Sequence, residues 1–252
     1  MLSKARIKLI NQLRQKKYRE INKMFFAEGS INVIDFIKSK ISVIELFATE
    51  DWINNNESII ADCLTTTVSF KDLKRISALS NPSDVLAIFE LPNMTTQARI
   101  NNSEFVIALD DISDPGNLGT IIRTADWFGI KHIFCSKNTV DAFNPKVVQA
   151  TMGSLSRVKI NYSDLDILFQ KIPDEFPIFG AVLNGLPLNK IEPQTNGIIL
   201  IGSEAHGISA ELLKYVSHKI TIPSKSYDST NKAESLNASI ANAIICYALC
   251  AQ

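Results

Sequence analysis

Hydrophobic and polar positions follow two alternating patterns along the chain, and the alternation predicts a mixed α/β protein. Short apolar runs such as residues 43–48, 85–89 and 105–110 have the length and composition of strands, and segments with apolar residues at helical spacing separate them. The other predicted strands are residues 24–29, 65–68, 132–135, 158–160, 177–182, 198–201 and 219–222. The predicted helices are residues 3–17, 30–40, 52–61, 72–77, 118–128, 144–156, 164–171, 209–216 and 233–249.

One polar segment without periodicity, residues 93–104, interrupts this alternation and is typical of a linker. It predicts a small α/β/α domain at 1–92 and a larger α/β domain at 105–252. Because strands that alternate with helices pair in parallel, the larger domain should contain a parallel sheet. The composition, 252 residues with 46% hydrophobic and 21% charged, suits globular domains with sizeable cores.

Charge is unevenly distributed at the N-terminal end of the chain. The formal net charge is zero, yet residues 1–23 contain eight basic residues against the single acid Glu20. A basic amphipathic helix at 3–17 suits a polyanion, and a solvated helix face explains the charges equally well. The candidate polyanion-binding residues are Lys4, Arg6, Lys8, Arg14, Lys16, Lys17 and Arg19.

Neither a membrane segment nor a metal site is expected. No stretch approaches the ~18 apolar residues of a membrane span, and the first residues lack the pattern of a secretory signal, which together predict a cytosolic protein. The four cysteines form no CxxC pair and the three histidines no HxxxH pair. We therefore interpret the cysteines as reduced core thiols and predict no metal ligands.

Polar residues cluster at three points where a strand, a turn and a helix follow one another: 110–125, 201–209 and 222–241. In the first, Pro115 and Gly116 predict a type II turn, and Asn117 is placed to cap the following helix. Apolar neighbours should face the sheet, which leaves Asn117 and Arg123 to face a ligand site.

Several common site chemistries do not fit these points. Gly202 and Gly207 have phosphate-loop spacing, but Ile208 and Ser209 stand where Lys and Ser or Thr are required. No GxGxxG follows a strand, and Ser203 lacks a GxSxG context. A dehydrogenase or kinase-like enzyme is therefore disfavoured. Singly, each polar residue also has a structural explanation: Asn117 as a cap, Glu204 as an acceptor of backbone amides, and Asn237 as a packing residue.

In their order along the chain, DPGNLGTIIRTA, ILIGSEAHGIS and ITIP with AESLNASIANAI closely resemble the three motifs of the SpoU/TrmH family of SPOUT RNA methyltransferases. The resemblance covers about residues 105–250, and the front domain, through FFAEG, is similar to the family's L30e-like substrate-binding domain. It implies a deep trefoil knot, otherwise almost excluded in proteins, S-adenosylmethionine bound in the loops of the knot, and a homodimer. The last helix offers an apolar dimer surface, which burial within one chain would explain equally well: Ile240, Ala241, Ile244, Ile245 and Leu249.

The resemblance also implies a reaction, methyl transfer to a ribose 2′-hydroxyl of RNA. Arg123 matches the arginine that activates the hydroxyl, either as a base or, since arginine stays protonated in proteins, as a phosphate clamp that stabilises the developing alkoxide. The other implied catalytic-pocket residues are Asn117, Glu204, Ser235 and Asn237. The implied cofactor-binding residues are Gly202, Ile222 and Leu236, through their backbone groups, with Ile201, Ser203 and Pro223 beside them.

Two features qualify this reading. The segment 224–234 is longer than the family loop and lacks its glycine, which affects the cofactor contacts expected there. The front domain favours ribosomal RNA over transfer RNA by analogy. The alternatives are a transfer RNA 2′-O-methyltransferase and a non-catalytic RNA-binding dimer.

Overall fold

The computed structural model describes residues 2–92, 100, 103–192, 194–224 and 233–250. It divides into two compact units, Met1–Asn93 with Asp141–Arg157, and Met94–Val140 with Val158–Gln252. The segment 141–157, which the sequence places in the second domain, therefore belongs to the first unit. The predicted linker at 93–104 lies mostly outside the described residues.

The first unit is built on a four-stranded sheet in the order β1-β4-β2-β3. Strand β4 is antiparallel to β1 and β2, and β2 is parallel to β3. The strands are β1 (Met24–Glu28), β2 (Val43–Ala48), β3 (Thr65–Thr67) and β4 (Val85–Glu90), and the helices are α1 (Lys4–Gln12), α2 (Lys16–Asn22), α3 (Ser30–Lys38), α4 (Glu50–Ile60), α5 (Phe70–Ile76), α7 (Pro145–Thr151) and the 3-10 turn η1 (Ser154–Ser156). The rings of Phe25, Phe36 and Phe89, with centroids 5.3–5.4 Å apart, form part of its core.

The single basic helix predicted at 3–17 is wrong, because α1 ends at Gln12 and α2 begins at Lys16. The burial of the Arg19 side chain explains the break between the two helices. The Arg19 guanidinium turns back from α2 and donates to the carbonyl oxygens of Leu13 and Arg14 at 2.8 and 3.0 Å. These carbonyls lie just past the end of α1, where helical acceptors lack intrahelical partners.

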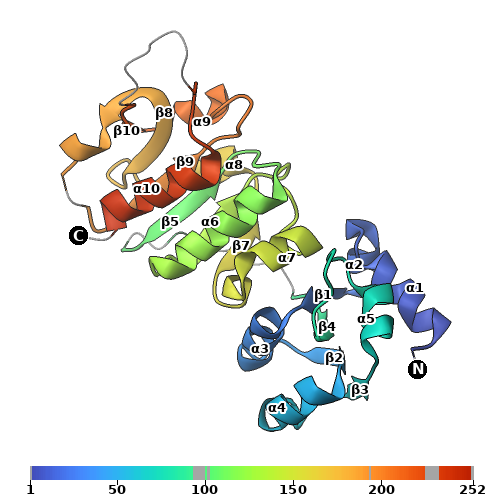
Figure 1. The fold of residues 1–252 in the computed structure, drawn as a ribbon. Helices are drawn as coiled ribbons and strands as arrows, with labels where there is room; N and C mark the ends of the chain where they lie inside the picture. Colours follow the sequence, from blue (N-terminus) through green and yellow to red (C-terminus); the bar gives the residue numbers. More distant parts are fainter. Residues whose placement is uncertain (1, 93–99, 101–102, 193, 225–232, 251–252) are drawn as a thin grey trace. The chain divides into compact units, whose positions relative to one another are not determined.

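The second unit contains the predicted parallel sheet. Its six strands lie in the order β10-β8-β9-β5-β6-β7, and every pair is parallel. The strands are β5 (Phe105–Leu109), β6 (His132–Cys135), β7 (Lys159–Tyr162), β8 (Ile178–Pro187), β9 (Gly197–Ile201) and β10 (His218–Thr221), and the helices are α6 (Pro115–Trp127), α8 (Leu165–Phe169), η2 (Leu188–Lys190), α9 (Ala210–Leu213) and α10 (Ala238–Cys250). Helix α10 packs against α6 and β9 (Figure 1). None of the helices described has the length and apolarity needed to cross a membrane.

Helices α6 and α10 of this unit begin three and five residues away from their predicted starts. Helix α6 starts at Pro115, with Asp114 as its N-cap accepting from the Asn117 amide at 2.8 Å. The type II turn at Gly116 and the cap at Asn117 are therefore wrong, since Asp114 supplies the cap. Helix α10 starts at Ala238 because the Asn237 side chain accepts from the backbone amides of the following turn.

Candidate functional site

The three polar segments meet at the carboxyl ends of β5 and β9, which are neighbours in the sheet. The first segment leads from β5 into α6, the second leaves β9, and the third ends where α10 begins. Loops at the carboxyl ends of parallel strands are where α/β proteins place their ligands. The topology thus brings together what the sequence separates by as many as 120 residues.

A chain of side-chain hydrogen bonds connects the three segments. The Asn237 amide nitrogen donates to the Asn117 carbonyl oxygen at 2.8 Å, and the Asn117 amide nitrogen donates to the Glu204 carboxylate. Asn237 also accepts from the Ser239 hydroxyl at 2.7 Å. Three predicted pocket residues therefore interact directly, and the Asn117 side chain serves these contacts instead of capping its helix.

The chain of bonds has a direction, since each amide donates toward Glu204. Asn117 is buried with 7% of its surface exposed, whereas Glu204 is exposed. Its negative charge strengthens the bond from Asn117, while water around the carboxylate weakens it. The result ties the turn after β9 to both α6 and the start of α10.

Backbone packing defines the turn after β9. A Cβ on Gly202 would lie 2.0 Å from the Gly207 carbonyl carbon and 2.2 Å from the Ile208 nitrogen, so only glycine fits. Ser203 and Gly207 exchange backbone hydrogen bonds of 3.0 and 2.9 Å, and Gly207 has φ +67°. The turn 202–208 is thus tightly closed, and main-chain groups rather than bulky side chains border its base.

Asp110 is a residue of this region that the sequence did not single out. It follows β5, has 7% of its surface exposed, and accepts from the Ser209 amide at 2.8 Å through its carboxylate. Its own amide donates to the Ile201 carbonyl at 2.9 Å. The only sequence signal for it is an acid placed directly after an apolar strand.

Other predicted site residues lie outside this hydrogen-bonded group. Arg123 is exposed, and within the described residues no hydrogen bond or ion pair involves its side chain. Arg123 follows Asn117 by six positions in α6, which places the two side chains about 240° apart around the helix axis. The two side chains therefore point to different faces of α6. Ser235 and Leu236 are exposed, as is Pro223, and residues 225–232 of the long loop lie outside the described residues.

The basic residues of the first unit divide into two groups. Arg19 is 2% exposed and pairs with Asp141, so its assignment to a polyanion-binding surface is wrong. Arg14 donates to the Ser77 carbonyl at 2.6 Å, and Arg6 pairs with Glu45 at 2.8 Å. The lysines of the predicted set are exposed: Lys4, Lys8, Lys16 and Lys17.

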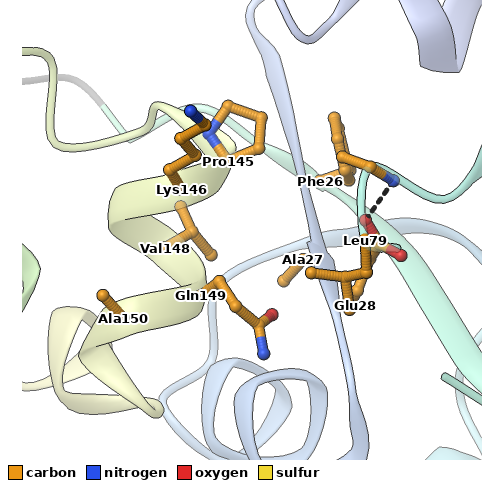
Figure 2. Close-up of a pocket in the computed structure, with 10 residues that line it drawn as sticks. Phe26, Ala27, Glu28, Leu79, Pro145, Lys146, Val148, Gln149 and Ala150 are labelled. Atoms are coloured by element: carbon orange, nitrogen blue, oxygen red, sulfur yellow. Dashed lines mark hydrogen bonds between the residues drawn. The ribbon is translucent and has the colours of Figure 1, made fainter. Parts of the chain in front are cut away.

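A cavity of about 250 Å³ lies within the first unit (Figure 2). Phe26 and Glu28 of β1, Leu79, and Val148 and Gln149 of α7 are among its lining residues, and none of the predicted site residues is. The Glu28 carboxylate accepts from the Ser77 hydroxyl and, at 2.7 Å, from the Ala78 amide. Burial nevertheless raises the pKa of Glu28 above its ordinary value.

Two family models match successive parts of the chain. Residues 104–247 match the model of the SpoU rRNA Methylase family, and residues 4–87 match that of the MRM3-like substrate binding domain. The chain belongs to the SpoU rRNA methylase family. The family suggested by the three motifs is thereby confirmed. A small substrate-binding domain that precedes the parallel sheet in the sequence is confirmed as well.

Individual relatives resemble this SpoU-family chain over almost its whole length. The 23S rRNA (guanosine(2553)-2′-O)-methyltransferase RlmP of Bacillus subtilis is 28% identical over 97% of this chain and 95% of its own. The AdoMet-bound rRNA methyltransferase of Sinorhizobium meliloti is 29% identical, with a TM-score of 0.84 over 98% of this chain and 95% of that one. A TrmH-family protein from Porphyromonas gingivalis is 33% identical, with a TM-score of 0.82 over 98% of both chains.

Proposed function

We propose that this chain transfers the methyl group of S-adenosylmethionine to a ribose 2′-hydroxyl of ribosomal RNA. The observation that carries the proposal is the hydrogen-bonded set Asn117, Glu204 and Asn237 beside the closed turn at Gly202. Membership of the SpoU family supports the reaction, and the AdoMet-bound state of the Sinorhizobium relative supports the cofactor. A chain that served only as an RNA-binding platform would not need this polar set.

The turn 202–208 suits a cofactor that is recognised by main-chain groups, because its backbone is closely packed and Gly202 carries no side chain to cover them. We assign cofactor binding to this turn and to the segment around the start of α10: Ile201, Gly202, Ser203, Ile222, Pro223 and Leu236. Backbone amides and carbonyls there can recognise an adenine edge without charged side chains. When bound, the cofactor supplies a methyl group activated by its sulfonium charge.

The residues of this chain then have two tasks, orientation and charge stabilisation. Arg123, exposed and without a partner in the described part of the chain, is assigned to the RNA. It remains protonated, so we propose that it clamps a phosphate and stabilises the negative charge that develops on the ribose oxygen, while solvent water takes up the hydroxyl proton. Asn117, Asn237 and Glu204 hold the pocket in one arrangement, and Ser235 completes it.

RNA binding by the first unit is assigned to its exposed lysines, Lys4, Lys8, Lys16 and Lys17. The name of the Bacillus relative supports ribosomal RNA as the substrate class. With about four phosphates neutralised, log affinity should fall with log salt at a slope of roughly −3 to −4. A flat salt response of RNA binding would remove these lysines from the interface.

The same proposal includes a homodimer formed through the second unit. Ile240, Ile244 and Tyr247 are 50%, 38% and 69% exposed on one face of α10, and Trp127 at the end of α6 is 84% exposed. Large apolar side chains exposed together on packed helices are typical of an interaction surface. Buried Ile245 and Leu249 belong instead to the core of the chain. A deep trefoil knot and a cytosolic location are further parts of the proposal that rest on family membership.

The experiment that tests the function is a methyl-transfer assay with radiolabelled S-adenosylmethionine, using unmodified ribosomal RNA and transfer RNA in parallel. We expect incorporation into ribosomal RNA, together with calorimetric binding of S-adenosylmethionine but not of ATP or NAD. Incorporation into transfer RNA alone would show that the substrate is transfer RNA and not ribosomal RNA. Absence of both cofactor binding and transfer would overturn the enzymatic function.

A further inference from the structure

The carboxylate of Asp110 connects the end of β5 to the residue that follows the turn 202–208. Its Oδ2 accepts from the Ser209 amide at 2.8 Å, while its own amide donates to the Ile201 carbonyl at 2.9 Å. Asp110 therefore contacts the chain immediately before and immediately after this turn. The residue is 7% exposed, which is unusual for an acid that has no cationic partner in the described part of the chain.

Hydrogen bonds within the turn fix its shape, and its last residue, Ile208, is buried in the same core cluster as Val106 and Ala108 of β5. Ser203 and Gly207 bond to each other through their backbones, and both belong to the turn. Glu204 ties the tip of the turn to Asn117, through a bond that solvent weakens. At the base of the turn, the Asp110 carboxylate adds a polar bond from the end of β5 to Ser209, the N-cap residue of α9.

We propose that Asp110 is a positioning residue for the cofactor, acting through the Ser209 amide to hold the turn 202–208 over the carboxyl end of the sheet. The inference rests on the proposed function, since it assumes that this turn binds S-adenosylmethionine. It adds to that function a residue which does not touch the cofactor and whose loss should weaken cofactor binding rather than the methyl-transfer step itself.

The test compares cofactor affinity and kinetics across a small set of variants. Asp110→Ala should raise the Kd for S-adenosylmethionine about tenfold, equivalent to about 1.4 kcal/mol, with kcat near wild type once the cofactor saturates. Asp110→Asn keeps an acceptor oxygen and should recover most of the affinity. Asp111→Asn is the matched control, because the neighbouring Asp111 carboxylate bonds to Ser136 and Asn138 instead of the turn; its Kd should not change.

The donor can be removed independently of the acid. Ser209 has φ −61° and ψ 150°, which suit proline, so Ser209→Pro deletes the amide hydrogen with little strain on that residue's backbone. It should raise the Kd as Asp110→Ala does, with Ser209→Ala as its control, and the double variant should be no worse than either single one. Additive losses would show that the two groups act separately and would overturn the inference.

Amide hydrogen exchange gives a readout that does not depend on activity. In the wild type the Ser209 amide should be protected, and in Asp110→Ala it should exchange faster while the β5 amides keep their protection. A folded Asp110→Ala variant with wild-type Kd overturns the inference alone. If Asp110→Ala does not fold, Ser209→Pro and Asp110→Asn decide it. A wild-type protein that binds no S-adenosylmethionine overturns the proposed function as well.

Discussion

The bond from Asn117 to Glu204 can be tested by reversing the chemistry of its donor. Asn117→Asp replaces the donating amide nitrogen with a second carboxylate oxygen, and it keeps an acceptor for Asn237. The variant therefore loses one charge-assisted bond and places two negative charges side by side. Asn117→Ala, which loses both bonds without adding a charge, is the reference for packing and hydrogen-bond loss alone.

The structure allows the cost to be estimated. A hydrogen bond to a charged group contributes about 1.5–3 kcal/mol, and the exposure of Glu204 places this bond near the lower value. Two like charges about 4 Å apart repel by about 1 kcal/mol in water and about 4 kcal/mol near a protein surface. A combined loss of about 3 kcal/mol would lower kcat/KM roughly a hundredfold if it falls on the transition state. Asn117→Ala loses both bonds without the repulsion, so it should lose less, about 2 kcal/mol or roughly thirtyfold.

The decisive measurement is a rescue. Adding Glu204→Gln to Asn117→Asp moves the donor to position 204 and the acceptor charge to position 117, which restores one charge-assisted bond. Methyl transfer by the double variant should exceed that of Asn117→Asp by at least about tenfold, which corresponds to about 1.4 kcal/mol, with thermal unfolding confirming that all variants fold. A double variant no more active than Asn117→Asp would refute the reasoning that this bond organises the pocket.

Three further predictions concern the cofactor turn and the first unit. Gly202→Ala should abolish S-adenosylmethionine binding in calorimetry, because its Cβ would lie 2.0 Å from the Gly207 carbonyl carbon; a Kd near wild type would contradict the assignment of this turn. Asp141→Ala should lower the free energy of unfolding by about 3 kcal/mol in urea titrations, since it leaves the buried Arg19 guanidinium without its carboxylate; an unchanged midpoint would show that the pair is energetically neutral. Burial raises the pKa of Glu28 above the ordinary 4.5, so the native state binds this proton more tightly than the unfolded chain does. The free energy of unfolding should therefore fall as the pH rises from 4.5 through the raised pKa of the native state. Glu28→Gln should lack that decline in melts from about pH 4 to 8, and identical pH profiles would exclude this carboxyl as its source.

The order of elements and the parallel sheet could be predicted from the sequence for a physical reason. Strands buried on both faces, such as β5 and β9, read as continuous apolar runs that are easily distinguished from amphipathic helices. Helix ends were less predictable, because several residues near Pro115 can serve as a cap. The structure selects Asp114, and this choice releases the Asn117 side chain to bond with Glu204 and Asn237.

The features that could not be predicted from the sequence depend on contacts between residues far apart in the chain. The break between α1 and α2 depends on Arg19, whose ion-pair partner Asp141 lies 122 residues later in the chain. No periodicity within residues 3–17 signals that contact. Asp110 has the same local pattern as any acid after a strand, and only the return of the chain to Ser209 distinguishes it. The motifs drew attention to Asn117, Glu204 and Asn237, whereas the bonds among these residues required the fold.

The central claim, methyl transfer to a ribose oxygen of RNA assisted by Arg123, is tested most directly by mass spectrometry of nucleosides from RNA treated with the enzyme and S-adenosylmethionine. The wild type should produce a nucleoside methylated on the ribose 2′-oxygen. Arg123→Ala should produce none while binding the cofactor with nearly unchanged affinity. A methyl group found on a base, or ribose methylation that persists in Arg123→Ala, would contradict the account.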